Sequence, residues 1–554
     1  MDLHGIGIGQ GVVVGRVVRM SDPLPDPADL PSELTADEEI ARAAASLRFV
    51  ATNLTERGAH AGGAARDVLE AQALMAEDPA LIDDIAVRLA RGTTAERAVF
   101  EAFGAFRDML TGLGGYMAER AVDLDDVSQR VRAHLAGQAP SEVPDPGHPF
   151  ILVARDLAPA DTALLNLDVV LGLITSGGGP TSHTAILARE KSILAIVGAA
   201  QATDLVDGDE VILDAARGVV VTDPTDAQKA EATTRIAERL ARRDAPLTPG
   251  MLADGTAIPL LANLANADGA ANAVALGAEG VGLFRTEFLF LDSATAPSVE
   301  VQQQKYELML REFAGKKVVV RALDAGADKP LAFLNDAVEE NPALGLRGLR
   351  SLRASEGILR DQLTALAQAD AATDADLWVM APMVATVEET AYFVALAHEL
   401  GLTTAGVMIE IPSAALLADR VLAQADFASI GTNDLTQYTL AADRMLGSVA
   451  AYQDPWHPAV LSLIRQVGSA GAALGKPVGV CGEAAADPML AVVLVGLGVT
   501  SLSMSASALA DVRASLAGYT LDAARSLAEV ALDAVGAPEA RAAVAEAAAR
   551  LSVH

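Results

Sequence analysis

The stretch from Val169 to Glu190, VVLGLITSGGGPTSHTAILARE, is where the interpretation of this chain starts. Its first eight residues are apolar and rich in branched side chains, which predicts a buried strand. Its last six residues, AILARE, present an apolar helix face. The glycines between them let backbone N–H groups approach a ligand, and the first turn of a helix favours anions. The stretch therefore predicts a strand–turn–helix unit of an α/β domain with an anion site at the turn.

His183 lies at this turn, directly before the predicted helix. A neutral imidazole beside a phosphate site is a nucleophile, so the position predicts a phosphohistidine. A histidine that only caps a strand–helix turn fits the same spacing, because a glycine-rich turn is a weak signal by itself. The spacing alone leaves both interpretations open.

The flanking sequence predicts that a helical domain interrupts the α/β domain. Residues 1–20 have glycine turns and β-branched runs, and strand patterns return at Phe150. Between them the pattern is helical, starting with a capping-box pair at Thr35 and Glu38 and favouring two antiparallel helix pairs. Proline-rich breakers stand at both crossings. We therefore expect an α/β domain of residues 1–21 and 143–225, with residues 22–142 as the inserted helical domain.

The second half of the chain alternates between strand and helix patterns. Residues 226–250 form a charged linker helix, and residues 251–554 follow as a further domain. Eight strands are predicted there: Ile258–Ala262, Val281–Phe284, Val318–Leu323, Trp378–Met383, Gly406–Ile411, Phe427–Ile430, Val478–Cys481 and Ser501–Met504. Eight such units in about 300 residues favour a (β/α)8 barrel, with a doubly wound sheet as the alternative.

Polar side chains follow five of these strands at the carboxyl end, where barrel enzymes place their active sites. They are Arg285, Glu287, Arg321, Asp324, Asp328, Lys329, Arg347, Glu410, Asn433, Asp434, Arg444, Cys481 and Glu483. Arginines clamp phosphate and carboxylate groups, and two carboxylates with open positions suit Mg²⁺. The set predicts a small, anionic, phosphorylated substrate.

Cys481 is the one cysteine of the chain. An ordinary thiol is mostly protonated at neutral pH, so at a strand end it can donate a proton. A buried, small apolar residue is the alternative.

The bulk composition excludes several classes of protein. Hydrophobic residues make up 51% of the 554 residues, and the net charge is -32, which argues against binding of nucleic acid or anionic membranes. A single cysteine suits a reducing compartment. The N-terminus lacks the pattern of a signal peptide, and the longest apolar run, Ala491–Val499, is too short to span a bilayer. We expect a cytoplasmic protein of two to four domains.

Several motifs resemble those of the phosphoenolpyruvate-utilising enzymes, and above all Enzyme I of the bacterial sugar phosphotransferase system. They are GGPTSHTAILAR around His183, then GLFRTEFLF, RALDAGADK, NPALGLRGLR, GTNDLTQYTLAADR and VCGEAAAD. The resemblance covers essentially the whole chain. It departs from the family pattern at Pro180, Ala327, Ile411, Met445 and Leu446, none of which is a catalytic group.

The resemblance implies roles residue by residue. Phosphoenolpyruvate would bind to Arg285, Arg321, Asn433, Asp434 and Arg444, with Arg347 as a helper. Glu410 and Asp434 would hold Mg²⁺, Cys481 would donate a proton and His183 would carry the phosphoryl group. The partner would be the phosphocarrier protein HPr, docked on the helical domain, and the barrel would form a homodimer. The reaction would be the first step of sugar uptake.

Two other functions are compared with this one. A dikinase or synthase would charge the same histidine from ATP, but the 182 residues before His183 contain no P-loop and are already accounted for. A catalytically silent regulatory scaffold would have lost barrel residues, whereas the arginines, Glu410, Asp434 and Cys481 are all present.

Overall fold

The computed structural model describes the chain except for residues 1, 10, 62, 114, 139–142, 158–160, 162–164, 180–181, 191–192, 244, 291–294, 327–330, 332, 335–338, 445 and 553–554. It divides into two compact units, Met1–Ala237 and Glu238–His554. Each unit has its own apolar cores. In the described part of the chain, no helix is long and apolar enough to cross a membrane.

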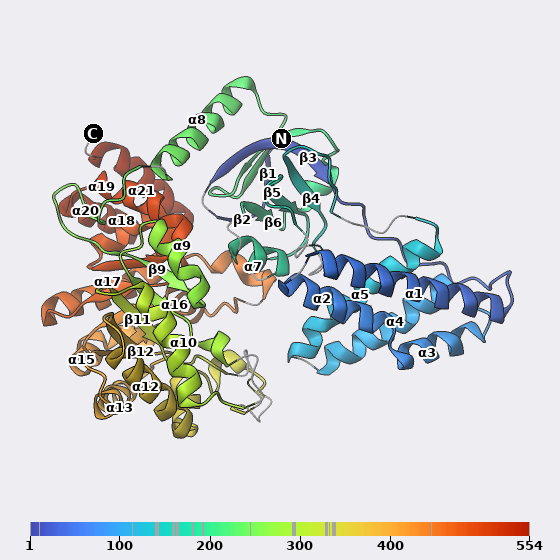
Figure 1. Ribbon diagram of the computed structural model, residues 1–554. Helices are drawn as coiled ribbons and strands as arrows, with labels where there is room; N and C mark the ends of the chain where they lie inside the picture. The colour runs from blue at the N-terminus through green and yellow to red at the C-terminus, as the bar shows by residue number, and fades with distance from the viewer. Residues whose placement is uncertain are drawn as a thin grey trace. The chain divides into compact units, whose positions relative to one another are not determined.

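The first unit contains an eight-stranded sheet with the order β1-β8-β7-β3-β4-β5-β6-β2 (Figure 1). The strands are β1 Asp2–His4, β2 Ile6–Ile8, β3 Val12–Arg19, β4 Phe150–Ala154, β5 Val170–Thr175, β6 Ala195–Val197, β7 Glu210–Asp214 and β8 Val219–Thr222. Strands β3 and β4 are parallel neighbours, with Val17 opposite Ile151. Because 130 residues separate the two strands along the chain, the helical block between them is an insertion into one continuous sheet.

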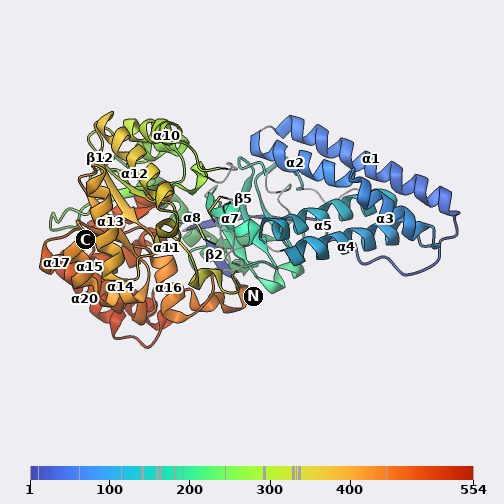
Figure 2. The same ribbon diagram turned by 90° about the horizontal axis from the view of Figure 1, so that it is seen from below.

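Five helices make up that insertion: α1 Ala36–Ala61, α2 Gly63–Ala76, α3 Pro79–Leu89, α4 Ala95–Leu113 and α5 Gly115–Leu135. Helix α1 packs on α2 and α4 packs on α5, so the predicted two pairs are present, while α3 adds a fifth helix against α4 (Figure 2). The predicted capping box starts α1, since Glu38 N donates to Thr35 Oγ1 at 3.3 Å and Thr35 N donates to Glu38 Oε2 at 2.9 Å.

Helix α8, Asp226–Arg243, carries the chain from the first unit into the second. The second unit is a closed barrel of eight parallel strands, which confirms the barrel and excludes the doubly wound sheet. Its strands are β9 Leu260–Leu264, β10 Val281–Phe284, β11 Lys317–Arg321, β12 Asp376–Ala381, β13 Ala405–Ile409, β14 Ala428–Ile430, β15 Val478–Val480 and β16 Ser501–Met504. The first strand begins two residues later than predicted, because Ile258 N donates to Gly250 O in a turn.

Helices surround the barrel on the outside (Figure 1). They are α9 Ala270–Ala275, α10 Val299–Glu312, α11 Leu349–Ala354, α12 Glu356–Ala371, α13 Val387–Glu399, α14 Pro412–Leu416, α15 Ala418–Gln424, α16 Thr432–Leu440, α17 Pro458–Leu474, α18 Pro488–Gly496, α19 Leu509–Ala517, α20 Leu521–Leu532 and α21 Ala537–Leu551. Their apolar faces and the outer faces of the strands form one large core. This packing holds the strand ends, and therefore the site that they carry, on rigid elements.

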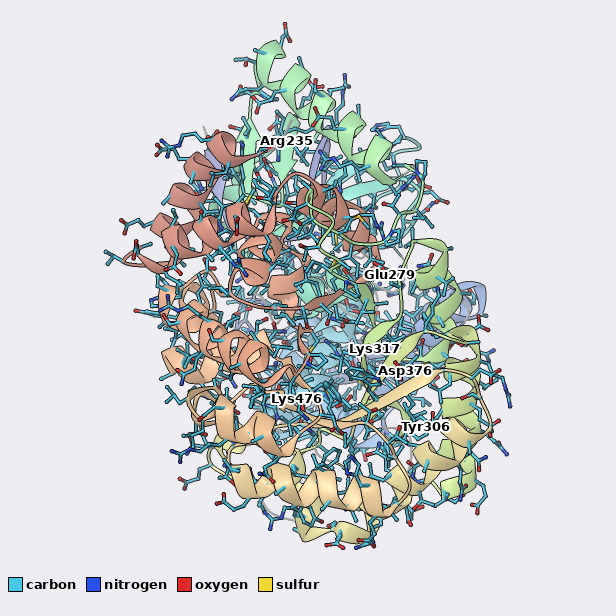
Figure 3. All side chains as sticks on the ribbon, turned by 90° about the vertical axis from the view of Figure 1, so that its left-hand side faces the viewer. Arg235, Glu279, Tyr306, Lys317, Asp376 and Lys476 are labelled. Carbon is cyan, nitrogen blue, oxygen red and sulfur yellow. The ribbon has the colours of Figure 1, made fainter. Side chains whose placement is uncertain are left out.

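The barrel interior is filled differently on its two sides. Leu283, Val319, Met380 and Met408 form an apolar cluster on β10 to β13. Small polar residues, among them Ser429, Ser501 and Ser503, line a small cavity from the other strands. At the amino-terminal end, Lys317 lies opposite Asp376 on the neighbouring strand (Figure 3).

Candidate active site

The carboxyl ends of the barrel strands bring the predicted polar residues together. Arg321 is the last residue of β11, and Glu410 follows β13 directly. Asp434 lies in the first turn of α16, which follows β14, and Cys481 follows β15 directly. All four side chains are buried. Residues that are far apart in the sequence are thus brought together at one end of the barrel.

Arg321 stands at the centre of a buried ion-pair network. Its guanidinium donates to Glu287 Oε1, and its Nη1 lies 3.2 Å from Asp324 Oδ2. These carboxylates, together with Glu410, raise its pKa, although burial alone would lower it. Arg321 Nε and Glu287 Oε2 are buried without a partner in the described structure. A permanent cation with a free donor is therefore fixed at the mouth of the barrel.

A second network joins Arg347 to Asp434. Arg347 Nη1 donates to Asp434 Oδ1 at 2.9 Å, and its Nη2 donates to Asp324 Oδ2 at 3.1 Å. Arg444 Nη1 donates to Asp434 Oδ2 at 3.3 Å, and the Arg444 side chain is 28% exposed. Asp324 therefore pairs with both Arg321 and Arg347, and Asp434 pairs with both Arg347 and Arg444. The family resemblance implies only a helping role for Arg347 in substrate binding. Its side chain is nevertheless the most deeply buried of the three arginines in these networks.

Glu410 is almost completely buried and accepts a hydrogen bond from Met383 N at 2.7 Å. Burial raises the pKa of its carboxyl to about 8, with further contributions from Asp434 and Asp324. A glycine is required beside it, because a Cβ at Gly431 would stand 2.7 Å from Glu410 Oε2. Among the described residues, no three His, Cys, Asp or Glu side chains converge closely enough to hold a metal ion alone.

The Cys481 side chain is 3% exposed, and its thiol donates to Ile430 O at 3.6 Å. Burial raises the pKa of this thiol to about 11, so it is protonated at neutral pH. Asn433 Oδ1 accepts a hydrogen bond from Glu483 N at 3.1 Å, which ties the start of α16 to the segment after Cys481. The thiol is therefore a proton carrier held in a fixed place.

Arg285 differs from the other arginines, because it is exposed. Its side chain has no ion pair or hydrogen bond to the described residues, while its backbone N donates to Leu264 O at 2.9 Å. The backbone is therefore anchored to β9 and the charge remains free for an anion.

His183 is the first residue of α7, His183–Glu190, as the sequence predicts. The turn before it is tied to its surroundings: Ala185 N donates to Ser182 Oγ at 3.3 Å, and Thr184 Oγ1 donates to Asp156 Oδ1 at 2.7 Å. Gly178 has a φ of 80°, and a Cβ there would stand 2.9 Å from Ser182 Oγ. Glycine is needed at that position for both reasons.

One residue of the site, Asn263, was not predicted from the sequence, and several predicted residues lie outside the described part of the chain. Asn263 Nδ2 donates to Cys481 O at 3.0 Å, although no charge marks the end of β9. Its signal is only an amide within an otherwise apolar strand. Asp328, Lys329, Pro180, Ala327 and Met445 lie outside the described residues.

Comparison with known families agrees with this architecture. Residues 241–521 match the PEP-binding domain of the PEP-utilising enzymes, residues 146–218 match their mobile domain, and residues 4–120 match their N-terminal domain. The first of these matches covers the barrel, and the second covers the His183 turn.

Similar proteins extend over almost the whole chain. A phosphoenolpyruvate-protein phosphotransferase of Streptomyces coelicolor is 50% identical over 543 residues, which cover 97% of this chain and 98% of that protein. The protein of the same name from Bacillus subtilis is 36% identical and covers 95% and 96%. A multiphosphoryl transfer protein of Rhodobacter capsulatus is 40% identical over 87% of this chain, which spans 59% of that protein. This chain belongs to the family of PEP-utilising enzymes.

Proposed function

We propose that this chain is a phosphoenolpyruvate-protein phosphotransferase. It moves the phosphoryl group of phosphoenolpyruvate to His183 and then to a histidine of the phosphocarrier protein HPr, with release of pyruvate. The observation that carries the proposal is the cluster of Arg321, Arg347 and Arg444, held by shared carboxylates at the same end of the barrel as the buried Cys481 thiol. Phosphoryl transfer needs positioning and charge stabilisation, and the cluster offers both.

The arginines of this cluster bind the phosphate and the carboxylate of phosphoenolpyruvate. Arg285 and Arg444 offer partly free guanidinium groups, and Arg321 offers a buried one with an unused Nε. Arg347 is held by two carboxylates and sets the position of Asp434. Asn433 completes the binding site. Because Asp324 and Asp434 already orient these side chains, little rearrangement is needed when the anion enters.

Mg²⁺ is the cofactor of the proposed reaction, held by Glu410 and Asp434. The residues fit it, because Mg²⁺ commonly takes one or two carboxylates and fills its other positions with water and substrate oxygens. Burial raises the pKa of Glu410 most, and Asp434 and Asp324 raise it further; a divalent cation bound there would offset the repulsion among these carboxylates. When bound, the ion would neutralise part of the negative charge on the phosphoryl group.

His183 and Cys481 have complementary tasks. A neutral ring nitrogen of His183 attacks the phosphorus in line, and the enolate that leaves is protonated at carbon by the Cys481 thiol. His183 belongs to the first compact unit and Cys481 to the second, so the proposed reaction uses residues of both units. The linker of residues 226–250 serves as a hinge.

The remaining assignments follow the family. HPr docks on the inserted helical domain, residues 22–142, while residues 1–21 and 143–225 form the domain that carries His183. Residues 251–554 form the barrel domain, which also makes a homodimer. The protein works in the cytoplasm, at the first step of sugar uptake.

Transfer of labelled phosphate tests the proposal. Radiolabelled phosphoenolpyruvate with Mg²⁺ should put acid-labile label on the wild-type chain and none on His183→Ala. Added HPr should remove the label from the chain. Label from ATP in place of phosphoenolpyruvate would indicate a dikinase, and label from neither would contradict the proposal.

A further inference from the structure

One side of the barrel interior is polar, which is unusual because branched apolar residues normally fill a barrel of this kind. Ser429, Ser501 and Ser503 are buried there, and Gly479 adds empty space between them. A Cβ at residue 479 would stand 2.9 Å from Ser501 Oγ and 3.9 Å from Ser429 Oγ. These hydroxyl groups therefore lie close to one another around the glycine.

This polar side reaches the thiol of the active site. Ser429 belongs to β14 and Cys481 directly follows the neighbouring strand β15, with Ser429 opposite Gly479 and Ile430 opposite Val480. Burial raises the pKa of the Cys481 thiol, and the Ser429 hydroxyl beside it acts in the opposite direction. Asn263 Nδ2 donates to Cys481 O at 3.0 Å, and Ser503 Oγ donates to Asn263 Oδ1 at 2.5 Å. The carbonyl of Cys481 is thus bound by the polar side of the interior, and its thiol lies beside Ser429.

A cavity extends the polar side toward the other end of the barrel. Its volume, measured as the space open to the centre of a water molecule, is about 10 Å³, which is room for about one water. Lys317, Ser429, Ser501 and Ser503 are its polar lining. A buried water needs two to four polar partners, and this lining supplies them.

Lys317 closes the amino-terminal end of the interior and is partly exposed to solvent (Figure 3). Its Nζ lies 3.4 Å from the centre of the Trp378 ring and has no ion pair with a described carboxylate. Burial lowers its pKa to about 8, while Asp376 opposes that shift. Asp426 lies just before β14 and Lys476 just before β15. Their side chains are 3.8 Å apart and form an ion pair with each other. Lys317 is therefore charged at neutral pH but able to release a proton.

The proposed reaction requires such a group, and the inference rests on that reaction. Each turnover moves the proton of Cys481 to carbon, and the thiol must be protonated again before the next turnover. Cys481 is 3% exposed, so solvent has little direct access to its thiol. A route through the barrel would serve while pyruvate still covers the mouth.

We propose that the polar side of the barrel interior returns a proton to Cys481 from Lys317, through one buried water and Ser429. The Cys481 thiolate takes the proton of the Ser429 hydroxyl, Ser429 takes one from the water, and the water takes one from the Lys317 ammonium. Solvent at the amino-terminal end then protonates Lys317. Each step of the relay transfers one proton and no electrons, so atoms and charge are conserved.

A comparison of the first turnover with later turnovers tests the relay in the full-length chain. The first turnover starts with a protonated thiol and does not need the relay, whereas every later turnover does. Lys317→Met should keep a first-turnover rate within about 2-fold of wild type, and Ser429→Ala should lose more in later turnovers than in the first. Their steady-state rate with excess HPr should fall at least 10-fold. Lys316→Met and Ser462→Ala are the matched controls and should change neither rate.

Two further measurements separate proton transfer from a structural role. Lys317→Arg keeps the cation over Trp378 but cannot release a proton at neutral pH, so it should be as slow as Lys317→Met in steady state. Methylamine should restore the steady-state rate of Lys317→Met. A wild-type rate for Lys317→Arg, or a first turnover slowed as much as the steady state, would overturn the relay. A wild-type chain that takes no label from phosphoenolpyruvate would remove the proposed function and the relay with it.

Discussion

The two ends of the barrel hold their cations in opposite ways. At the carboxyl end, Arg321 and Arg347 share Asp324, and each has a second carboxylate within hydrogen-bonding distance. At the amino-terminal end, Lys317 lies over an aromatic ring. Carboxylates keep the arginines charged and oriented, whereas burial next to a ring leaves the lysine able to titrate. The comparison teaches that one barrel can hold permanently charged cations at one end and a titratable cation at the other.

Loss of Arg321 is expected to have the largest effect. Arg321→Met leaves Glu287 buried without its arginine and leaves Asp324 paired with Arg347, and breaking such a buried pair costs about 3–5 kcal/mol of unfolding free energy. Phosphoryl transfer should fall at least 1000-fold, because the charge of the substrate loses a fixed donor. Urea unfolding followed by tryptophan fluorescence checks the stability. Arg360→Met, which breaks two ion pairs on the surface, is the control and should lower the stability far less than Arg321→Met does.

The thiol of Cys481 should react about 100-fold more slowly than a free cysteine with an alkylating reagent at pH 8. Its pKa is raised to about 11 by burial, so thiolate is scarce at that pH. Because the chain has one cysteine, the reaction of the whole protein reports this thiol alone. The rate should still be rising between pH 9 and pH 10. A plateau below pH 9 would show that the thiol has an ordinary pKa.

Glu410 should make the barrel less stable as the pH rises from about 4.5 to about 8. The carboxyl binds its proton more tightly in the folded state, where its pKa is about 8, than in the unfolded chain, so stability falls across that window in the absence of Mg²⁺. Glu410→Gln should therefore be more stable than wild type at pH 8, by a few kcal/mol at most, and equally stable near pH 4. Urea unfolding at both pH values measures this difference. A constant difference between the two proteins would mean that Glu410 has a normal pKa.

The smallest effect concerns Lys317 and its ring. In a Trp456→Phe background, the fluorescence of Trp378 should titrate with a midpoint near pH 8, as the ammonium above the ring loses its proton. Lys317→Met should abolish that titration and change the unfolding free energy by about 1 kcal/mol, the size of an exposed or partly buried cation–π contact. A midpoint that persists in Lys317→Met would assign the titration to another group.

The sequence predicts most of the fold because periodicity and breakers are local signals. The eight barrel strands were found within about two residues of their observed ends, and the proline-rich crossings marked the helical insertion. The strand-end rule also predicts that Arg321, Glu410 and Cys481 lie at the same end of the barrel, as the structure shows. What the sequence could not give was pairing. Arg347 and Asp434, which form a hydrogen bond, are 87 residues apart in the sequence. Asn263 and Cys481, whose carbonyl accepts from the Asn263 amide, are 218 residues apart.

The polar side of the barrel interior was invisible for a similar reason. Serines within strands such as β14 and β16 are ordinary strand residues, and only closure of the barrel brings Ser429 and Ser501 to one cavity with Lys317. The motif around His183 was readable from the sequence, since glycines and a helix start are local. Its partner in the reaction, the barrel pocket, comes from residues spread over the second compact unit.

The most direct test of the account is the mass of the intact chain after incubation with phosphoenolpyruvate and Mg²⁺, followed by fragmentation to locate the modification. We expect one phosphoryl group per chain, located on His183, with one pyruvate released for each group bound. The group should be absent from His183→Ala and lost when HPr is added. A chain that stays unmodified, or that carries the group on another residue, would contradict the proposed transfer.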